Sequence, residues 1–259
     1  MIPPIILTAF GTSSTARTTY NLIESGVKDQ FPTHDIYWGF TSGVLQKKIK
    51  EKTGETINHP LEIIEELRKE NHRRIIVQSL HLFSGSDFHT LFQTLRKNHD
   101  ICTVGNPILT SPDDYLALMT MLAPIVKKEA DQAILVVGHG TSHPTWPVYT
   151  ALEHLLQTCF GSRLFVGTVE HYPDTRGLEK KIKDRGFQKV YMIPLFLVTG
   201  LHYRRDMMGD GIDSWKTRLE KEGLEVRCLD KGLGELPGFS DLICSHIRCA
   251  LDCPQWSEV

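Results

Sequence analysis

Two histidines and a glutamate, widely separated in the chain, are the side chains with the clearest chemical potential. His139, Glu170 and His202 follow one another at spacings of 31 and 32 residues. Two imidazoles and a carboxylate form a mixed nitrogen and oxygen ligand set that suits borderline divalent cations such as cobalt, nickel, iron(II) or zinc. The same set can transfer protons, because histidine titrates near neutral pH. These residues act together only if the fold brings them to one place.

Short apolar runs alternate with longer amphipathic stretches along the whole chain. Eight of these runs predict strands, and they are Ile5–Phe10, Ile36–Phe40, Ile75–Leu82, Ile101–Val104, Ala133–Gly138, Leu164–Val169, Lys189–Leu197 and Leu224–Cys228. Helical periodicity fills the gaps, as within Pro60–Asn71, where Pro60 suits the first turn of a helix. Strands that alternate with helices predict parallel β-α-β units. The continuous apolar character of the runs indicates sheets covered by helices on both faces.

The two halves of the chain resemble each other. The segment Leu7–Ser13 matches Val136–Ser142 at an offset of 129, and Val77–Gly85 matches Met192–Gly200 at an offset of 115. An internal repeat of this kind indicates an ancient duplication. We therefore expect an α/β fold of two similar Rossmann-like domains, residues 1–130 and 131–259. Each domain would hold a parallel sheet flanked by helices, with a cleft between the domains.

The repeat also predicts where the chemical side chains lie. Ligands of parallel α/β sheets bind at the carboxyl ends of the strands. His139, Glu170 and His202 each follow a predicted strand of the second domain, and the corresponding strand ends of the first domain carry Phe10 and Asp87. Each of the three also has an ordinary structural interpretation: His139 could cap a helix, Glu170 could form a salt bridge, and His202 could be an exposed loop residue. Their shared sheet edge favours a common site.

Composition and motifs exclude several classes of function. A formal net charge of −2 provides no positive field for nucleic acid or an anionic membrane. The N-terminus lacks the basic region of a signal peptide, and the longest apolar run, Tyr191–Val198, is too short to cross a membrane. Neither a P-loop nor a dinucleotide-binding glycine motif follows the first strand, which argues against a nucleotide cofactor. Six cysteines without a Cys-x-x-Cys pair are typical of reduced thiols in the cytoplasm.

Several segments together resemble the anaerobic sirohydrochlorin cobalt chelatases, the class II tetrapyrrole chelatases. The segments that carry the resemblance are Leu7–Thr12, Gln78–His81, Val137–Pro144, Val169–Pro173 and Pro194–Met207. The resemblance runs over nearly the whole chain. It implies a chelatase fold of two facing Rossmann-like domains, which inserts Co(II) into sirohydrochlorin in cobalamin biosynthesis. Two protons would be released, without nucleotide hydrolysis and with no cofactor beyond the substrate metal.

The resemblance also implies roles for individual residues. His139, Glu170 and His202 match the metal ligands of the family and would be its catalytic groups. Asp87 stands where the family usually has a glutamate that faces the cleft. Leu201 departs from the usual Gly-Asp-His form of its segment, a change that bears on metal preference or on a neighbouring hydrogen bond.

A tetrapyrrole with carboxylates around an apolar centre needs a pocket with apolar walls and a cationic rim. Phe10, Trp146, Tyr149 and Leu201 are candidate walls, and Arg204 and Arg205 are candidate rim residues. The aromatic residues equally suit a core, and the arginines a solvated helix.

Three further questions stay open at the level of sequence. An iron or nickel chelatase acting on sirohydrochlorin or a porphyrin would use the same ligands, because first-row cations differ little in their affinity for them. A non-catalytic tetrapyrrole or metal carrier would use the same cleft. The apolar helical residues fit either a core or the contact of a homo-oligomer.

Overall fold

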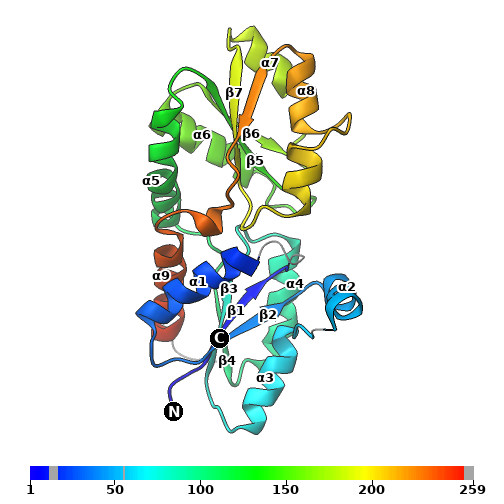
Figure 1. The fold of residues 1–259 in the computed structure, drawn as a ribbon. Coiled ribbons are helices and arrows are strands. Elements are labelled where there is room, and N and C mark those ends of the chain that lie inside the picture. The colour runs from blue at the N-terminus through cyan, green and yellow to red at the C-terminus, as the bar shows by residue number, and fades with distance from the viewer. Residues whose placement is uncertain (12–16, 55, 254–259) are drawn as a thin grey trace. The chain divides into compact units, whose positions relative to one another are not determined.

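The chain forms two compact units that both contain a parallel sheet (Figure 1). The computed structural model describes residues 1–11, 17–54 and 56–253, so Thr12 and Ser13 of the first repeated segment lie outside the described residues. One unit consists of Met1–Asp114 and Pro237–Val259, and the other of Tyr115–Leu236. This division differs from the single boundary expected near residue 130, because the chain returns to the first unit for its last helix.

The first unit contains four parallel strands in the order β2-β1-β3-β4. These strands are β1 (Ile5–Ala9), β2 (Ile36–Phe40), β3 (Ile75–Ser79) and β4 (Cys102–Gly105). Its helices are α1 (Arg17–Gln30), α2 (Gly43–Thr53), α3 (Pro60–Lys69), α4 (Ser86–Leu95), a short 3-10 turn (Arg96–Asn98) and α9 (Phe239–Asp252). Helix α3 begins at Pro60, as predicted, and His59 and Glu62 form a capping box at its N-terminus.

Helices cover both faces of the first sheet. On one face, apolar side chains of α3 and α4, including Ile64 and Leu91, pack with Ile6 and Val77 of the sheet. Helices α1 and α9 pack against each other, and α9 also packs on β3 and β4. The approach of α1 to α9 is close: a Cβ atom on Gly26 would lie 2.5 Å from the Cβ of Ser240. Burial of its apolar side chains, among them Phe239, Ile243 and Ile247, holds the C-terminal helix in the first unit.

The second unit repeats the same topology with strand order β6-β5-β7-β8. Its strands are β5 (Ala133–Gly138), β6 (Leu164–Thr168), β7 (Lys189–Pro194) and β8 (Glu225–Cys228). Since β5 stands where β1 stands in the first sheet, the two sheets match in the way the sequence repeat predicts. All eight predicted strands are present and differ from the prediction only at their ends. Strand β7, for example, ends at Pro194, which has no N–H to continue the ladder.

The core of the second unit fixes the segment that carries His202. Helices α7 (Leu178–Asp184) and α8 (Trp215–Lys221) and a π-helix (Tyr203–Met207) cover one face of the sheet. Trp215 is 1% exposed, and its indole nitrogen donates a hydrogen bond of 3.1 Å to the carbonyl oxygen of Thr168. Met207 is buried in the same cluster. Helix α6 (Val148–Phe160) packs on β6.

The remaining elements connect these layers. Helix α5 (Pro112–Lys128) begins in the first unit and ends in the second, and a 3-10 turn (Leu233–Glu235) precedes the return of the chain to the first unit. No helix in the described ranges is long and apolar enough to cross a membrane.

Candidate functional site

The structure brings His139, Glu170 and His202 together at the carboxyl edge of the second sheet. His139 directly follows β5, Glu170 follows β6, and His202 follows β7. Parallel strands point their carboxyl ends to one edge, so residues far apart in the chain meet there. The three side chains are 47%, 37% and 31% exposed, which leaves all of them accessible to a ligand.

The distances within this group are short. The Nε2 atoms of His139 and His202 lie 3.1 Å apart. A carboxylate oxygen of Glu170 lies 4.0 Å from the His139 Nε2, and the other lies 3.9 Å from the His202 Nδ1. At a metal–imidazole distance of about 2.1 Å, two nitrogens this close subtend roughly a right angle at a shared ion. The spacing therefore suits one cation.

The backbone segments that follow β5 and β6 fix His139 and Glu170 relative to each other. The Glu170 amide donates to the His139 carbonyl oxygen at 2.9 Å, and Thr141 and Tyr172 form an antiparallel bridge just beyond. Gly140 lies between these contacts with a φ of +81°, a conformation that favours glycine. Backbone hydrogen bonds between the two strand ends thus hold both residues in place.

Tyr149 supports this backbone through a hydrogen bond. Its hydroxyl oxygen accepts a hydrogen bond of 3.0 Å from the Gly140 amide, and the residue is only 4% exposed. Burial raises the pKa of the phenol to about 12, so the hydroxyl stays neutral. The structure therefore contradicts the expectation that Tyr149 forms a pocket wall. Its ring packs in the core against Gly138. A core position is the alternative that the sequence also allows for this residue.

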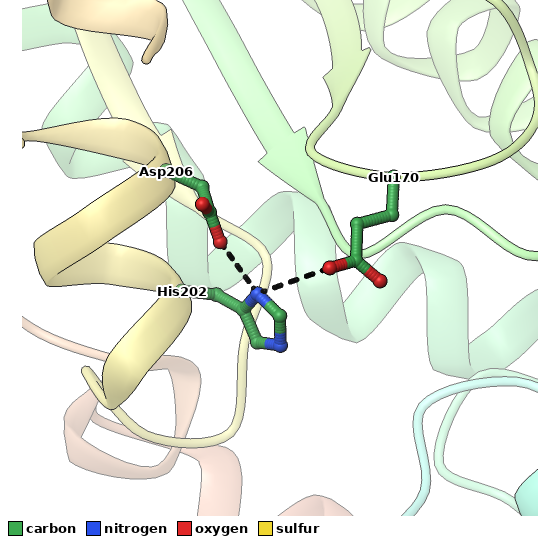
Figure 2. Close-up of side chains that lie close together, drawn as sticks. All are labelled: Glu170, His202 and Asp206. Carbon is green, nitrogen blue, oxygen red and sulfur yellow. Dashed lines mark hydrogen bonds and ion pairs between the residues drawn. The ribbon is translucent and has the colours of Figure 1, made fainter. Parts of the chain in front are cut away.

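Asp206 belongs to the same group, although the sequence analysis did not select it. One of its oxygens lies 2.7 Å from the His202 Nδ1 (Figure 2). Atoms of Glu170, His202 and Asp206 all lie within 4.8 Å of one another. The signal that could have revealed Asp206 is its position four residues after His202, the spacing at which helical side chains meet.

Arg205 pairs with both acidic residues of the site. Its Nε donates to Asp206 at 2.6 Å, and its Nη2 lies 3.6 Å from a Glu170 oxygen. Burial raises the pKa of the Asp206 carboxyl, but hydrogen bonds from Arg205 and His202 outweigh this effect and leave the pKa below its ordinary value. The acid is therefore a carboxylate at neutral pH.

The comparisons with known proteins decide the family. A family model described as "Cobalt chelatase (CbiK)" matches residues 4–252. The chain belongs to the cobalt chelatase (CbiK) family. Across 255 residues it is 31% identical to the sirohydrochlorin cobaltochelatase of Salmonella typhimurium, with 96% of both chains covered. It is 28% identical to the sirohydrochlorin cobaltochelatase CbiKC of Nitratidesulfovibrio vulgaris, with 95% of this chain and 90% of that protein covered.

Solved structures show the same fold as this member of the cobalt chelatase family. SirB from Bacillus subtilis with Fe3+ superposes with a TM-score of 0.67 at 15% identity, covering 97% of this chain and 96% of SirB. CbiX, described as the terminal enzyme for biosynthesis of siroheme in denitrifying bacteria, superposes with a TM-score of 0.62 at 14% identity and covers 96% of this chain and 100% of CbiX. The predicted chelatase fold is thereby confirmed.

The other predicted site residues of this chelatase are divided between its units. Phe10 follows β1 and Asp87 lies in the first turn of α4, both exposed at the carboxyl edge of the first sheet. Trp146, Leu201 and Arg204 are exposed in the second unit. The roles of these five residues, and the cleft between the domains, stay predictions.

Two further residues of the chelatase lie beside Glu170 in the chain. His171 has a φ of +56°, uncommon for a residue with a side chain, and its Nε2 lies 3.8 Å from Glu170. Tyr172 is 57% exposed, and its ring centroid lies 6.4 Å from that of Trp146. Tyr172 was not among the predicted walls. The two exposed rings form an apolar surface, and Tyr172 follows Glu170 by two residues.

Proposed function

We propose that this protein inserts Co(II) into sirohydrochlorin as a step of anaerobic cobalamin biosynthesis. Membership of the cobalt chelatase family supports the reaction, and both of its named relatives are sirohydrochlorin cobaltochelatases. The observation that carries the proposal for the site is the convergence of two Nε2 atoms at 3.1 Å with the Glu170 carboxylate beside them. The cytoplasmic location expected from the sequence is part of the proposal.

Insertion of a metal into a tetrapyrrole sets three requirements. Two pyrrole N–H protons must leave, the ring must bend to expose its nitrogen lone pairs, and the ion must be released by its previous ligands. In this proposal His139, Glu170 and His202 hold Co(II) on one face of the ring and give up their bonds one at a time. Each imidazole that leaves the ion becomes a base and accepts a proton at its Nε2. The imidazolium ions formed in this way lie on side chains that are 47% and 31% exposed, so they can pass these protons to water.

The substrate would be held by groups around this site. The exposed rings of Trp146 and Tyr172 offer an apolar surface for the macrocycle. Arg204 is exposed, and its guanidinium suits the carboxylates of the substrate. Arg205 is already paired with Asp206 and Glu170, so in this proposal it serves the metal site more than the rim.

The choice of metal belongs to the proposal as well. The relatives' names favour cobalt, whereas imidazole and carboxylate ligands accept iron(II) and nickel almost equally. Initial insertion rates for Co(II), Fe(II) and Ni(II) at equal metal concentrations measure the preference. We expect cobalt to be inserted fastest. A faster rate with iron would assign the protein to the alternative iron reaction.

The experiment that tests the function is an absorbance time course with sirohydrochlorin in large excess over the protein. A chelatase forms metallated product far beyond its own concentration, at a rate proportional to protein and above the rate in buffer. A carrier forms at most one equivalent of bound complex and then stops. Product limited to one equivalent would contradict the enzymatic function and support the non-catalytic carrier that the sequence also allows.

A further inference from the structure

The hydrogen bond between His202 and Asp206 determines which ring nitrogen of His202 can bind an ion. The Nδ1 lies 2.7 Å from an Asp206 oxygen and 3.9 Å from the nearest Glu170 oxygen. An ionised carboxylate only accepts hydrogen bonds, so the His202 Nδ1 carries the proton in this contact. The Nε2 of the neutral ring then has its lone pair available, and this atom faces the Nε2 of His139 at 3.1 Å.

The opposite imidazole has a matching arrangement. The His139 Nδ1 lies 3.3 Å from the carbonyl oxygen of Gly140, which can only accept a hydrogen bond. If both rings carry their proton on Nδ1, two lone pairs face each other across 3.1 Å. Such a pair is stable only with a proton or a cation between the nitrogens. The arrangement is that of a prepared cation site.

Asp206 is itself held firmly. Arg205 donates to one Asp206 oxygen from Nε at 2.6 Å and to the other from Nη2 at 3.0 Å. Both residues belong to the π-helix whose last residue, Met207, is 0% exposed in the core. The Met208 amide completes the wide turn by donating to the Tyr203 carbonyl oxygen at 2.9 Å. The carboxylate therefore meets the His202 ring at a position set by the fold.

We propose that Asp206 is a positioning residue that fixes the tautomer and ring orientation of His202, so that Nε2 binds the substrate metal. This inference rests on the proposed function for the identity of the metal, Co(II). It decides between two sets of ligand atoms in the same cluster. In one set, the ion binds the two Nε2 atoms and Glu170. In the other, it binds Glu170, the His202 Nδ1 and Asp206 directly, since these atoms also lie within 4.8 Å. Acceptors that orient metal-bound histidines in this way typically change metal affinity 10–100-fold when they are removed.

The first test reads the tautomer in the metal-free protein, so it does not depend on the proposed function. Nitrogen-15 NMR of histidine-labelled protein, recorded well above the imidazole pKa, distinguishes a ring protonated on Nδ1 from one protonated on Nε2. We expect Nδ1–H for His202 in the wild type and a shift toward Nε2–H in Asp206→Ala. The His202→Ala variant assigns the signals. A wild-type His202 protonated on Nε2 would overturn the inference.

The second test measures the dissociation constant of Co(II) alone from its visible absorption. In Asp206→Ala the affinity should fall about 10–100-fold. In Asp206→Asn the amide oxygen still accepts from Nδ1–H, and the 56% exposed Arg205 can turn away from the amide NH2. Asparagine should therefore restore most of the affinity. Asp210→Ala is the matched control, because this carboxylate of the same segment is 92% exposed and pairs with Lys216 at 2.9 Å.

Each outcome has one meaning for the inference. An asparagine variant as weak as the alanine variant would make Asp206 a direct ligand and refute the positioning role. Unchanged cobalt affinity in Asp206→Ala would refute any role. A protein that binds Co(II) with the expected variant pattern but never metallates sirohydrochlorin would contradict the proposed function and leave the positioning role standing.

Discussion

A Cβ atom added to Gly140 would lie 1.8 Å from the carbonyl oxygen of Glu170. The two residues belong to adjacent strand ends, and no side chain fits between them while the site keeps its geometry. Gly140→Ala must therefore displace the Glu170 backbone. Because Glu170 belongs to the proposed ligand set, we expect a weaker Co(II) affinity as well as a lower free energy of unfolding.

Gly177→Ala separates the two effects of that change. Gly177 also has a positive φ, +83°, but nothing lies within 4 Å of the position its Cβ would take. Both variants should lose about 1–2 kcal/mol of stability from the backbone conformation. Only Gly140→Ala should lose cobalt affinity. Equal cobalt binding by both variants, measured by titration alongside urea unfolding, would show that the tight contact does not position Glu170.

Replacement of either proposed histidine ligand should abolish insertion and preserve the fold. His139 and His202 are 47% and 31% exposed at a sheet edge, so His139→Ala and His202→Ala remove little buried surface. We expect changes in unfolding free energy below about 0.5–1 kcal/mol. The rate of cobalt insertion should fall to the rate in buffer. His154→Ala is the control, since this exposed imidazole lies on α6. A folded His202→Ala protein with wild-type rates would remove His202 from the mechanism.

Asp114 ties the C-terminal helix to the start of α5 and should contribute to stability against acid. It lies 3.0 Å from the His246 ring on α9, and one of its oxygens accepts from the Thr110 amide at 3.0 Å. Burial raises the pKa of Asp114, but the backbone hydrogen bonds and the His246 charge lower it by more than burial raises it. The net pKa therefore lies below the ordinary 3.8. The stabilisation is thus complete above about pH 3.8 and is lost as the pH falls through the lower native pKa.

Asp114→Asn tests this contribution. The variant should lose about 1–3 kcal/mol at neutral pH, and the difference from the wild type should shrink as the pH falls below 3.8. The exposed neighbour Asp113→Asn serves as the control. Unfolding measured between neutral and strongly acidic pH checks the result. A difference that stays constant through this range would show that the Asp114 charge does not stabilise the fold.

His81 should produce a pH dependence of stability in a different range. Burial lowers its pKa from 6.5, and the nearby Asp87 charge opposes this only in part. Its Nδ1 lies 2.9 Å from the Ser79 hydroxyl, while its buried Nε2 has no hydrogen-bond partner within the described structure. Below about pH 6.5 the unfolded chain takes up a proton that the native ring resists, so stability falls.

His81→Asn should flatten this part of the stability curve. The free energy of unfolding of the wild type should decrease from pH 6.5 downward more steeply than that of the variant. His154→Asn, at the exposed α6 position, should keep the wild-type slope. Parallel curves for His81→Asn and the wild type would contradict a depressed native pKa.

The strands could be predicted from the sequence because buried parallel strands are continuous apolar runs bounded by glycine and polar residues. The same pattern, read with the repeat, placed His139, Glu170 and His202 at one sheet edge. The return of α9 to the first unit could not be predicted. The apolar face of an amphipathic helix shows that it packs on something, but it does not identify the partner.

Local geometry explains the residues that sequence reasoning placed differently. The ring of Tyr149 could face a pocket or the core at the same helical position, and only the packing against Gly138 settles it. Arg205 suited a cationic rim by its charge, but a wide π-turn directs it onto Asp206. A π-turn has no clear sequence signature, so the His202 and Asp206 pair was visible only as a spacing of four.

The location of cobalt in the protein is the most direct test of the account. An anomalous difference map recorded at the cobalt absorption edge, from crystals soaked in Co(II), shows where the ion binds. We expect one strong peak bonded at about 2.0–2.2 Å to the Nε2 atoms of His139 and His202 and to a carboxylate oxygen of Glu170. A strong cobalt peak at another position, with none of these three side chains bonded to cobalt, would contradict the account.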